Sequence, residues 1–343
     1  MKKISLILTV VACLFVGCKQ QNNSTSNKVQ MKIASFNLRF DETMHKKFDD
    51  PKKADHWNAR RAVIVPMMRY HGVDIFISQE LFAHQIKQLE ADGVYKAVED
   101  FNLVATFMPQ LKTGHNLPAE RVFKDGLGEF DKKNFIAGRN RDYGDAVEYR
   151  MHNTIFYKPE KFEVLKQGSF FLSATPDKFS VGWDTMNTKA SQMRRCFWVK
   201  FKEKNSGKEF FVFNTHTPSS RASEPERQKA AELIVKKIKA IPGDNTFFFG
   251  GDLIARPGSP SINYYHAQKG YMFDTKLVSK TAPYGPKGTF NLWGKTVKDR
   301  KADRIDFIFV SKDVSVFDYA VLSDTYYDVY PSDHFPITSR VEF

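Results

Sequence analysis

A series of short runs of apolar, β-branched and aromatic residues constrains the fold more than any other feature of the chain. Most of the runs are bounded by Gly, Pro, Asp or Lys, which is typical of strands. Several are apolar nearly throughout, such as Phe247–Phe249 and Ile305–Val310, and this indicates strands that are buried on both faces. The runs lie at Lys32–Phe40, Val73–Leu81, Asn153–Tyr157, Gly168–Ser173, Arg195–Phe201, Glu209–Thr217, Thr246–Leu253, Arg304–Val310, Val314–Leu322 and Ile337–Phe343.

Helical periodicity separates these runs in two places. Ser223–Ile241 carries apolar residues at the 3.6-residue period of a helix and begins with a capping box. Asp55–His71 has similar spacing around Pro66, which we expect to kink or divide the helix. Buried strands with helices between them predict a layered α/β fold in one domain, residues 31–343. The polar, Gly-containing stretch at about 101–141 is interpreted as a long insertion beside the site that the strands build.

The N-terminus has the pattern of an export signal. Lys2 and Lys3 precede the apolar run Ile4–Val16, which is shorter than the about 20 residues that a membrane span needs. Leu14–Cys18 resembles a bacterial lipobox, so we expect a signal peptide at 1–17 and a lipidated Cys18, with simple cleavage and release as the alternative. The polar stretch at 18–30 is predicted to be a flexible tether. Together these segments predict an anchored protein of the cell envelope.

The charge and the cysteine content limit the classes of partner. A net charge of +13, two units of which belong to Lys2 and Lys3, favours phosphates, nucleic acid, acidic lipid headgroups or polyanionic glycans. Solubility without a specific partner is the alternative, and no protein partner can be inferred. No block of five or more Lys or Arg residues suggests a nucleic-acid tail. Cys196 lies in a strand-like run and is interpreted as a buried structural thiol.

Polar residues stand at or near the ends of the predicted strands. An ionisable side chain in so apolar a run is costly unless it is paired, neutralised or bound to a metal. One such residue can simply cap a turn, but the whole set meeting at one place would indicate a site. The chain has no phosphate-binding loop ending in Gly-Lys-Ser/Thr, no Gly-x-Ser-x-Gly, no His-Glu-x-x-His and no Cys-x-x-Cys. The residues in question are Asn37, Glu80, His216, Asp252, Asp306, Asp333 and His334.

In this motif order the chain resembles the endonuclease/exonuclease/phosphatase superfamily. That group includes pancreatic deoxyribonuclease, abasic-site endonucleases, inositol polyphosphate phosphatases and neutral sphingomyelinases. The resemblance covers Lys32 to Phe343, and its specificity lies in the ordered set. It implies an α/β sandwich of two mixed, mostly antiparallel sheets packed face to face, with helices outside. The matching motifs are Ser35–Arg39, Gln79-Glu80, Phe170–Ser173, Gly182–Asp184, Asn214–His216, Gly288–Phe290, Arg304–Asp306 and Ser332–Pro336.

The resemblance implies a metal site of oxygen ligands. Asn37 and Glu80 would hold Mg²⁺, with Mn²⁺ as the alternative, and Asp333 would complete the shell directly or through water. A small set of oxygen ligands suits magnesium, which keeps several waters and takes substrate phosphate as a ligand. The metal would polarise the phosphoryl oxygen and neutralise developing charge.

The resemblance also assigns the groups around the phosphate. Asp252 would orient or deprotonate the attacking water. His334 would contact the phosphate, with Asp306 fixing its tautomer and favouring its protonated form. His216 would touch the phosphate and assist the leaving oxygen. Two weaker candidates for phosphate contact are Asn153, whose alternative is a turn hydrogen bond, and Arg39, whose alternative is a surface ion pair.

Two departures bear on activity. Most of the superfamily reads Gly-Asp-x-Asn where this chain has Gly251–Ile254, so the amide that places water and phosphate is replaced by an aliphatic side chain. Close relatives often continue Leu-Asp-His after the motif His, whereas Thr217–Ser219 follows His216 here. We expect an exported Mg²⁺-dependent hydrolase of phosphodiesters or phosphomonoesters, acting on nucleic acid, sugar phosphates or phospholipid headgroups. The alternative is a degenerate, lipid-anchored protein that binds phosphorylated ligands without turnover.

Overall fold

The computed structural model describes residues 28–41, 56–102, 123–124, 129–130, 151–178, 183, 194–218, 224–298, 303–326 and 329–343. The predicted signal peptide, Cys18 and most of the tether lie outside these residues, as does most of the predicted insertion. Within the insertion, β4 (Phe123–Lys124) pairs antiparallel with β5 (Glu129–Phe130). In the described part of the chain, no helix has the length and apolar character that crossing a membrane requires.

The strands form two six-stranded sheets. The first has the order β13-β14-β1-β2-β6-β3 and the second β11-β12-β10-β9-β8-β7. The bounds in the first sheet are β1 Gln30–Asn37, β2 Ile75–Leu81, β3 Lys96–Asn102, β6 Met151–Tyr157, β13 Ser315–Val321 and β14 Ile337–Glu342. Those in the second are β7 Phe162–Phe171, β8 Arg195–Glu203, β9 Glu209–His216, β10 Phe247–Asp252, β11 Met272–Asp274 and β12 Asp306–Ser311.

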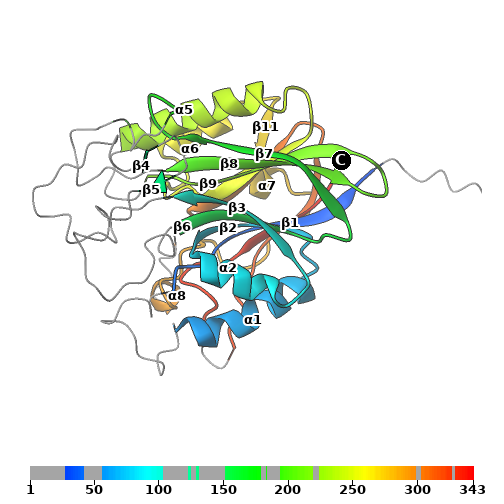
Figure 1. Ribbon diagram of the computed structural model, residues 1–343, viewed down its shortest axis with the longest axis vertical. Helices are drawn as coiled ribbons and strands as arrows, with labels where there is room; N and C mark the ends of the chain where they lie inside the picture. Colours follow the sequence, from blue (N-terminus) through cyan, green and yellow to red (C-terminus); the bar gives the residue numbers. More distant parts are fainter. Residues whose placement is uncertain are drawn as a thin grey trace, which may run out of the picture.

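Each sheet is mixed, because one central pair of strands is parallel. These pairs are β1 with β2 and β9 with β10, and every other described pairing within the two sheets is antiparallel. The sheets face each other across a core in which β1 packs against β10 (Figure 1). The predicted α/β sandwich is therefore confirmed.

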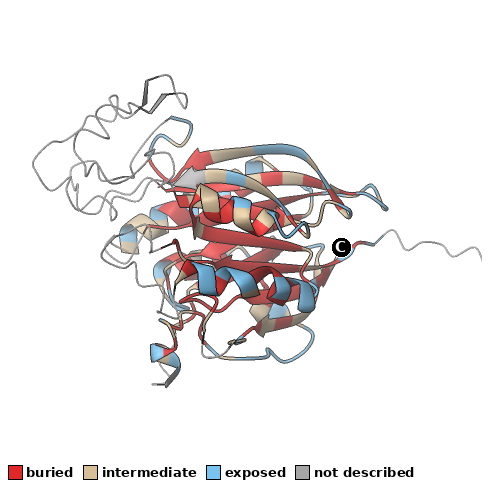
Figure 2. Ribbon diagram, turned by 60° about the horizontal axis from the view of Figure 1, so that its bottom comes forward, coloured by how far each residue is buried: buried red, intermediate tan, exposed pale blue. Residues whose placement is uncertain are grey.

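Helices cover both outer faces of the sandwich. α1 (Trp57–Tyr70) and α2 (Ala83–Glu90) bury apolar residues against the first sheet. α5 (Glu224–Ala240) and α6 (Pro260–His266) do so against the second. Figure 2 brings the helices of the first sheet to the front, where exposed residues line the faces turned away from the sheet. The short helices α7 (Thr275–Val278) and α8 (Lys295–Lys298) lie in the connections. Pro66 lies inside α1 and does not divide it, so of the two predicted effects, a kink or a division, the division is wrong.

Side chains facing the inside of the sandwich change from apolar to polar toward one end. Along a strand every second residue faces the same side. In β9 the inward series is Phe210, Val212, Asn214 and His216, of which the first two belong to the apolar core. In β12 it runs from Val310 through Ile308 to Asp306, and in β1 from Ile33 to Asn37. Because the strands are in register, their polar ends meet at one end of the sandwich.

Candidate active site

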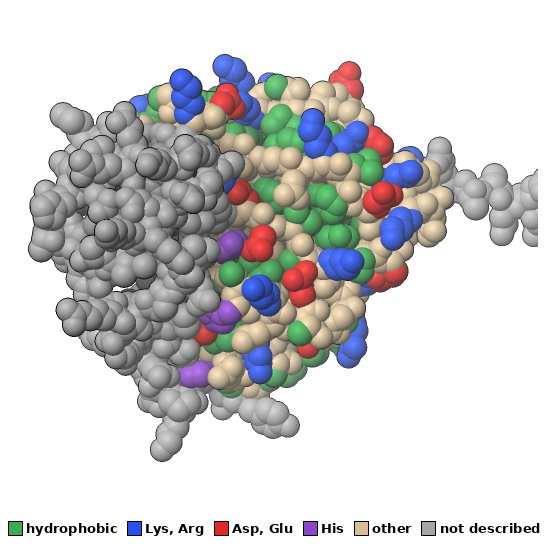
Figure 3. Space-filling view, in the orientation of Figure 1, with side chains coloured by type: hydrophobic (Ala, Val, Ile, Leu, Met, Phe, Trp, Pro, Cys, Tyr) green, Lys and Arg blue, Asp and Glu red, His purple; other side chains and the backbone are tan. Residues whose placement is uncertain are grey.

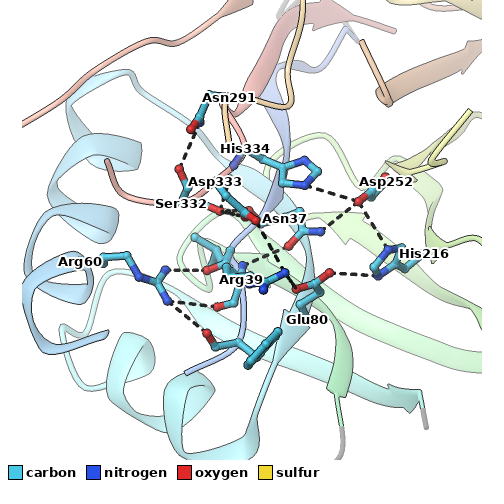
Figure 4. A network of polar contacts seen from close by, with 12 residues as sticks. Asn37, Arg39, Arg60, Glu80, His216, Asp252, Asn291, Ser332, Asp333 and His334 are labelled. Atoms are coloured by element: carbon cyan, nitrogen blue, oxygen red, sulfur yellow. Dashed lines mark hydrogen bonds and ion pairs between the residues drawn. The ribbon is translucent and has the colours of Figure 1, made fainter. Parts of the chain in front are cut away.

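The strand ends of β1 and β10 meet at the amide of Asn37. Its Nδ2 donates to Asp252 Oδ2 at 3.0 Å, and its Oδ1 accepts the backbone N–H of Arg39 at 3.0 Å (Figure 4). The two bonds fix the amide with its oxygen directed away from Asp252. Asp252 reaches this place because Gly251 has φ 136° and passes so close to Thr215 that a Cβ would lie 1.9 Å from the Thr215 carbonyl oxygen. Only glycine fits there.

Glu80 is set into the site by an irregularity of β2. The β2–β6 register shifts between Ser78 and Leu81, and Glu80 has φ 70°, which is left-handed for a residue with a side chain. Its Oε1 lies 3.9 Å from Nδ1 of His216. Its Oε2 is buried and accepts no hydrogen bond from the residues that the structure describes.

The loop before β14 is joined to the end of β1 through Ser332. The Ser332 hydroxyl donates to the Asn37 carbonyl oxygen at 2.6 Å and accepts the backbone N–H of His334 at 3.2 Å. Asp333 stands between them, buried, with Oδ2 3.6 Å from Nη1 of Arg39. The predicted triplet Ser332–His334 thus places a carboxylate on one side and an imidazole on the other side of the Asn37–Asp252 pair.

His334 and Asp306 form a buried pair. Nδ1 of His334 is 2.9 Å from Asp306 Oδ2, while Nε2 points toward Asp252 Oδ2 at 3.7 Å. Burial alone lowers the pKa of His334, but the carboxylates of Asp306 and Asp252 outweigh it and raise that pKa to about 10. The imidazole is therefore cationic near neutral pH. The Phe290 ring lies against it edge-on, with ring centroids 5.0 Å apart.

The pKa values of Asp252 and His216 are shifted in opposite directions, and in both cases burial, which favours the neutral form, is the largest cause. Burial, followed by the charge of Asp306, raises the pKa of Asp252 to about 7. Burial and the positive charge of Arg194 lower the pKa of His216 well below its usual range, so this imidazole is neutral. Its Nε2 is 3.4 Å from Asp252 Oδ2. One cationic and one neutral imidazole therefore flank the same carboxylate, which is an arrangement for moving a proton at that oxygen.

The two weaker candidates differ in their surroundings. Arg39 has Nη1 3.6 Å from Glu80 Oε2 and 3.6 Å from Asp333 Oδ2, so it lies inside the cluster. Asn153 is buried within β6 and donates from Nδ2 to the Arg195 carbonyl oxygen at 2.9 Å, which ties it to β8. The alternative of a turn hydrogen bond is wrong for Asn153, because it lies in a strand.

Two buried arginines at the site were not predicted. Arg194 directly precedes β8 and adds positive charge near His216 and Glu80. A charged residue at the start of an apolar run was the available signal. Arg60, on α1, donates to the carbonyl oxygens of Leu38 at 2.8 Å and Pro331 at 3.0 Å, and so links the two segments that carry Asn37 and Asp333. Arg60 gave no such signal, because an Arg in a predicted helix is ordinarily read as an exposed residue.

Comparison with known proteins identifies the family. The family model described as Endonuclease/Exonuclease/phosphatase family matches residues 34–334. The chain belongs to this family. Its fold is similar to that of a mannosyl-6-phosphatase from Bacteroides thetaiotaomicron, at 29% identity and TM-score 0.68 over 91% of this chain and 100% of that one. It is also similar to that of the endonuclease/exonuclease/phosphatase from Bacteroides vulgatus, at 23% identity and TM-score 0.69 over 91% of this chain and 98% of that one. Among curated proteins no match is found.

The human nocturnin catalytic domain, solved with a bound sulfate anion, shares the fold at 15% identity and TM-score 0.60, over 92% of this chain and 95% of that one. Members of the endonuclease/exonuclease/phosphatase superfamily are phosphoesterases, and this supports a hydrolase. Divalent metal ions are general in the family. The described chain offers oxygen donors for such an ion at Asn37, Glu80 and Asp333, and the unsatisfied Glu80 Oε2 suits a hard cation.

A second group of possible ligands lies nearby. Asp252, Asp306 and His334 each offer one possible ligand atom, and these three atoms lie within 4.8 Å of one another. In this group, however, His334 Nδ1 is engaged with Asp306 and Asp252 Oδ2 accepts the Asn37 amide. Within the described part of the chain, a buried carboxylate oxygen without a hydrogen bond is present in both groups, Oε2 of Glu80 in the first and Oδ1 of Asp306 in the second.

The residue that departs from the family pattern keeps an unusual backbone. Ile254 has φ 53°, a conformation that Asn adopts readily and a β-branched residue adopts at a cost. Its N–H donates to Asp252 Oδ1 at 2.9 Å. The turn that positions the Asp252 carboxylate is therefore formed, and only the side-chain amide is missing. Of the second departure, Thr217 is buried and donates to the Leu253 carbonyl oxygen at 2.5 Å, while Ser219 lies outside the described residues.

Proposed function

We propose that the chain is a Mg²⁺-dependent phosphoester hydrolase that works outside the cytoplasm. The observation that carries the proposal is the meeting of seven predicted residues, from both sheets, at one end of the sandwich: Asn37, Glu80, His216, Asp252, Asp306, Asp333 and His334. No structural need of the core explains four carboxylates and two imidazoles in one buried place.

The residues divide the chemistry between them. Asn37, Glu80 and Asp333 would hold Mg²⁺, which supplies a Lewis acid for the phosphoryl oxygen. Asp252 would orient the attacking water and accept its proton, which a carboxylate with a pKa of about 7 can do near neutral pH.

The imidazoles would serve the phosphate. Protonated His334 would donate from Nε2 to a phosphate oxygen, while Asp306 holds the proton on Nδ1. His216, which is neutral, would contact the phosphate on the side nearer Glu80.

The preferred substrate class is a sugar phosphate. This preference rests on the likeness to a mannosyl-6-phosphatase at 29% identity. Nucleic acid and phospholipid headgroups remain substrates to be tested. On the described part of the face in Figure 3, Lys and Arg side chains are interspersed with Asp and Glu, and these residues form no single basic stripe for a nucleic-acid backbone.

The location is proposed from the N-terminal sequence. A lipid anchor at Cys18 would attach the enzyme to the membrane of the cell envelope. Fractionation of cells that produce the full chain, compared with Cys18→Ala, tests this directly. The wild type should sediment with membranes and the variant should not. Equal distribution of the two proteins would contradict the anchor.

The activity is tested with the purified chain and Mg²⁺. Release of phosphate from mannose 6-phosphate and cleavage of bis-p-nitrophenyl phosphate and of single-stranded DNA should be measured in parallel, with Asp252→Ala as the control. We expect turnover that chelation abolishes and that Asp252→Ala reduces at least a thousandfold. Binding of phosphate without turnover above that control would instead favour the degenerate binding protein, for which the Ile254 substitution is the supporting observation.

A further inference from the structure

Arg39 lies where the two acidic metal ligands come together. Its Nη1 is 3.6 Å from Glu80 Oε2 and 3.6 Å from Asp333 Oδ2 (Figure 4). A single guanidinium nitrogen thus stands between the carboxylates that the proposed function gives to Mg²⁺. Two cations cannot both take full advantage of the same carboxylate oxygens, because they repel each other and share the same lone pairs.

The backbone of Arg39 is fixed although its side chain is not enclosed. Arg39 has φ 55°, which is disfavoured for a residue with a Cβ. Its N–H donates to Asn37 Oδ1 at 3.0 Å, and its carbonyl oxygen accepts from Gln85 Nε2 at 3.2 Å and Arg60 Nη2 at 3.4 Å. The side chain is 29% exposed and its Cζ lies 4.3 Å from the Phe40 ring centroid. Displacement of the guanidinium from the two carboxylates requires a rotation of the side chain alone, with the backbone kept in place.

We infer that Arg39 is an internal counter-cation of the metal site, which a divalent metal displaces from Glu80 and Asp333 and which then binds the substrate phosphate. The inference rests on the proposed function, since it needs a metal at these carboxylates. Before displacement, the positive charge of Arg39 offsets the repulsion between the carboxylates of Glu80 and Asp333 and holds both near the positions in which they would bind the metal. After displacement, its planar donors face a ligand to which they are suited, because guanidinium binds phosphate through two parallel hydrogen bonds.

A consequence is that Arg39 weakens metal binding and strengthens phosphate binding. The opposite signs separate this role from simple phosphate contact, which would leave metal affinity unchanged, and from a structural role, which would weaken both. The affinity of the intact protein for Mn²⁺, followed by electron paramagnetic resonance without phosphate, measures the first effect. Titration of the Mn²⁺-loaded protein with inorganic phosphate measures the second.

Arg39→Met should bind Mn²⁺ about tenfold more tightly than the wild type, a difference of about 1.4 kcal/mol, and inorganic phosphate about tenfold more weakly. Arg39→Lys, which keeps the charge without the planar fork, should bind Mn²⁺ as the wild type does and phosphate less tightly. Arg340→Met is the matched control, because it removes the same charge from an exposed residue paired with Asp318 at the other end of β14. It should change neither affinity.

Equal or weaker Mn²⁺ binding by Arg39→Met, with the variant folded by circular dichroism, overturns the inference. If the wild type binds Mn²⁺ and turns substrate over while the variant binds the ion no more tightly, only the role of Arg39 fails. If the wild type binds no Mn²⁺, the inference and the proposed metal site fail together. Arg39→Lys binding as tightly as Arg39→Met would also contradict it, since charge then would not matter.

Discussion

Replacing Ile254 by Asn tests how far one side chain limits this site. The backbone at 254 already has φ 53° and already donates its N–H to Asp252 Oδ1 at 2.9 Å. Asn tolerates this left-handed conformation better than a β-branched residue does. The substitution therefore adds an amide beside Asp252 without requiring the turn to change.

The expected size of the effect follows from two terms. Relief of the left-handed strain is worth about 1–2 kcal/mol, and the loss of a partly buried isoleucine costs on the order of 1 kcal/mol. The stability of Ile254→Asn should thus stay within about 1 kcal/mol of the wild type, or about 2–4 °C in melting temperature. One preorganised donor is typically worth a hundred- to a thousandfold in rate. Because the backbone N–H is already in place, we expect kcat to rise by about tenfold to a hundredfold.

The assay is initial-rate turnover of the preferred substrate with saturating Mg²⁺, together with thermal unfolding. Ile254→Gly relieves the backbone strain without adding an amide, and Ile254→Val retains the strain. Only Asn should raise kcat, whereas Gly and Val should not. A change of less than twofold in a folded Ile254→Asn protein would refute the reasoning, since the missing amide would then not limit the rate. Equal gains with Asn and Gly would assign the limit to backbone strain.

Three further predictions follow from the same geometry. kcat/KM should rise with pH near pH 7 as Asp252 ionises, and bound metal should lower the pH of this rise. It should fall near pH 10 as His334 loses its proton. Asp306→Asn should move this fall to lower pH, and a fall at unchanged pH would contradict the pairing of Asp306 with His334. Because the pKa of His334 is raised on folding, its contribution to stability is complete below its ordinary value of 6.5 and is lost as the pH rises through about 10, which thermal unfolding across pH can follow. Arg60→Met should lower the free energy of unfolding by about 3 kcal/mol or more in urea titrations, since it leaves buried carbonyl oxygens without a donor. Arg60→Lys should recover part of the loss. An unchanged urea midpoint would exclude Arg60 as a link between the segments that carry Asn37 and Asp333.

The sandwich strands were largely predictable because they are buried on both faces. Every predicted apolar run except Gly168–Ser173 contains most of an observed strand, with end differences of a few residues; that run covers only the C-terminal part of β7, which begins at Phe162. β3 and β11 were missed for physical reasons. β3 lies at the edge of its sheet, and Lys96–Asn102 mixes charged residues with Ala97 and Val98, which are only partly buried against the apolar clusters. β11 spans only Met272–Asp274, which is too short for any periodicity.

Pro66 shows where local propensity loses to packing. A proline within a helix removes one hydrogen bond and crowds the preceding turn, so the sequence predicted a kink or a break. In the structure α1 continues through it, with Pro66 facing solvent and with Ile64, Met67 and Met68 buried on the first sheet. Because the buried residues on both sides of the proline pack against the same sheet, tertiary contacts hold the helix together.

The convergence of the site was not available from sequence alone. The period of two tells which face a residue occupies but not which strands are neighbours. Here Asp252 is paired with His216 on one side, through a parallel register, and with Asp306 on the other, through an antiparallel one. Three polar strand ends thus become one cluster through pairing over long separations in the chain. Arg39 was predicted as a weaker candidate for phosphate contact, with a surface ion pair as the alternative, and the sequence did not indicate its two carboxylate neighbours, Glu80 and Asp333.

Residues with a strained backbone lie at the end of the sandwich that carries the site, and they bear on whether the enzyme is active. Among described residues other than glycine, left-handed φ values occur at five positions, and three of them contact the cluster directly: Arg39, Glu80 and Ile254. The other two, Leu292 and Trp293, follow Asn291, where the Leu292 N–H donates to the Asp333 carbonyl oxygen at 3.0 Å. Each such residue costs about 1–3 kcal/mol, which the packed sandwich must offset. A protein that only bound phosphate would gain stability by relaxing these turns, so their presence around Asp252 and Glu80 favours a site held in place for catalysis.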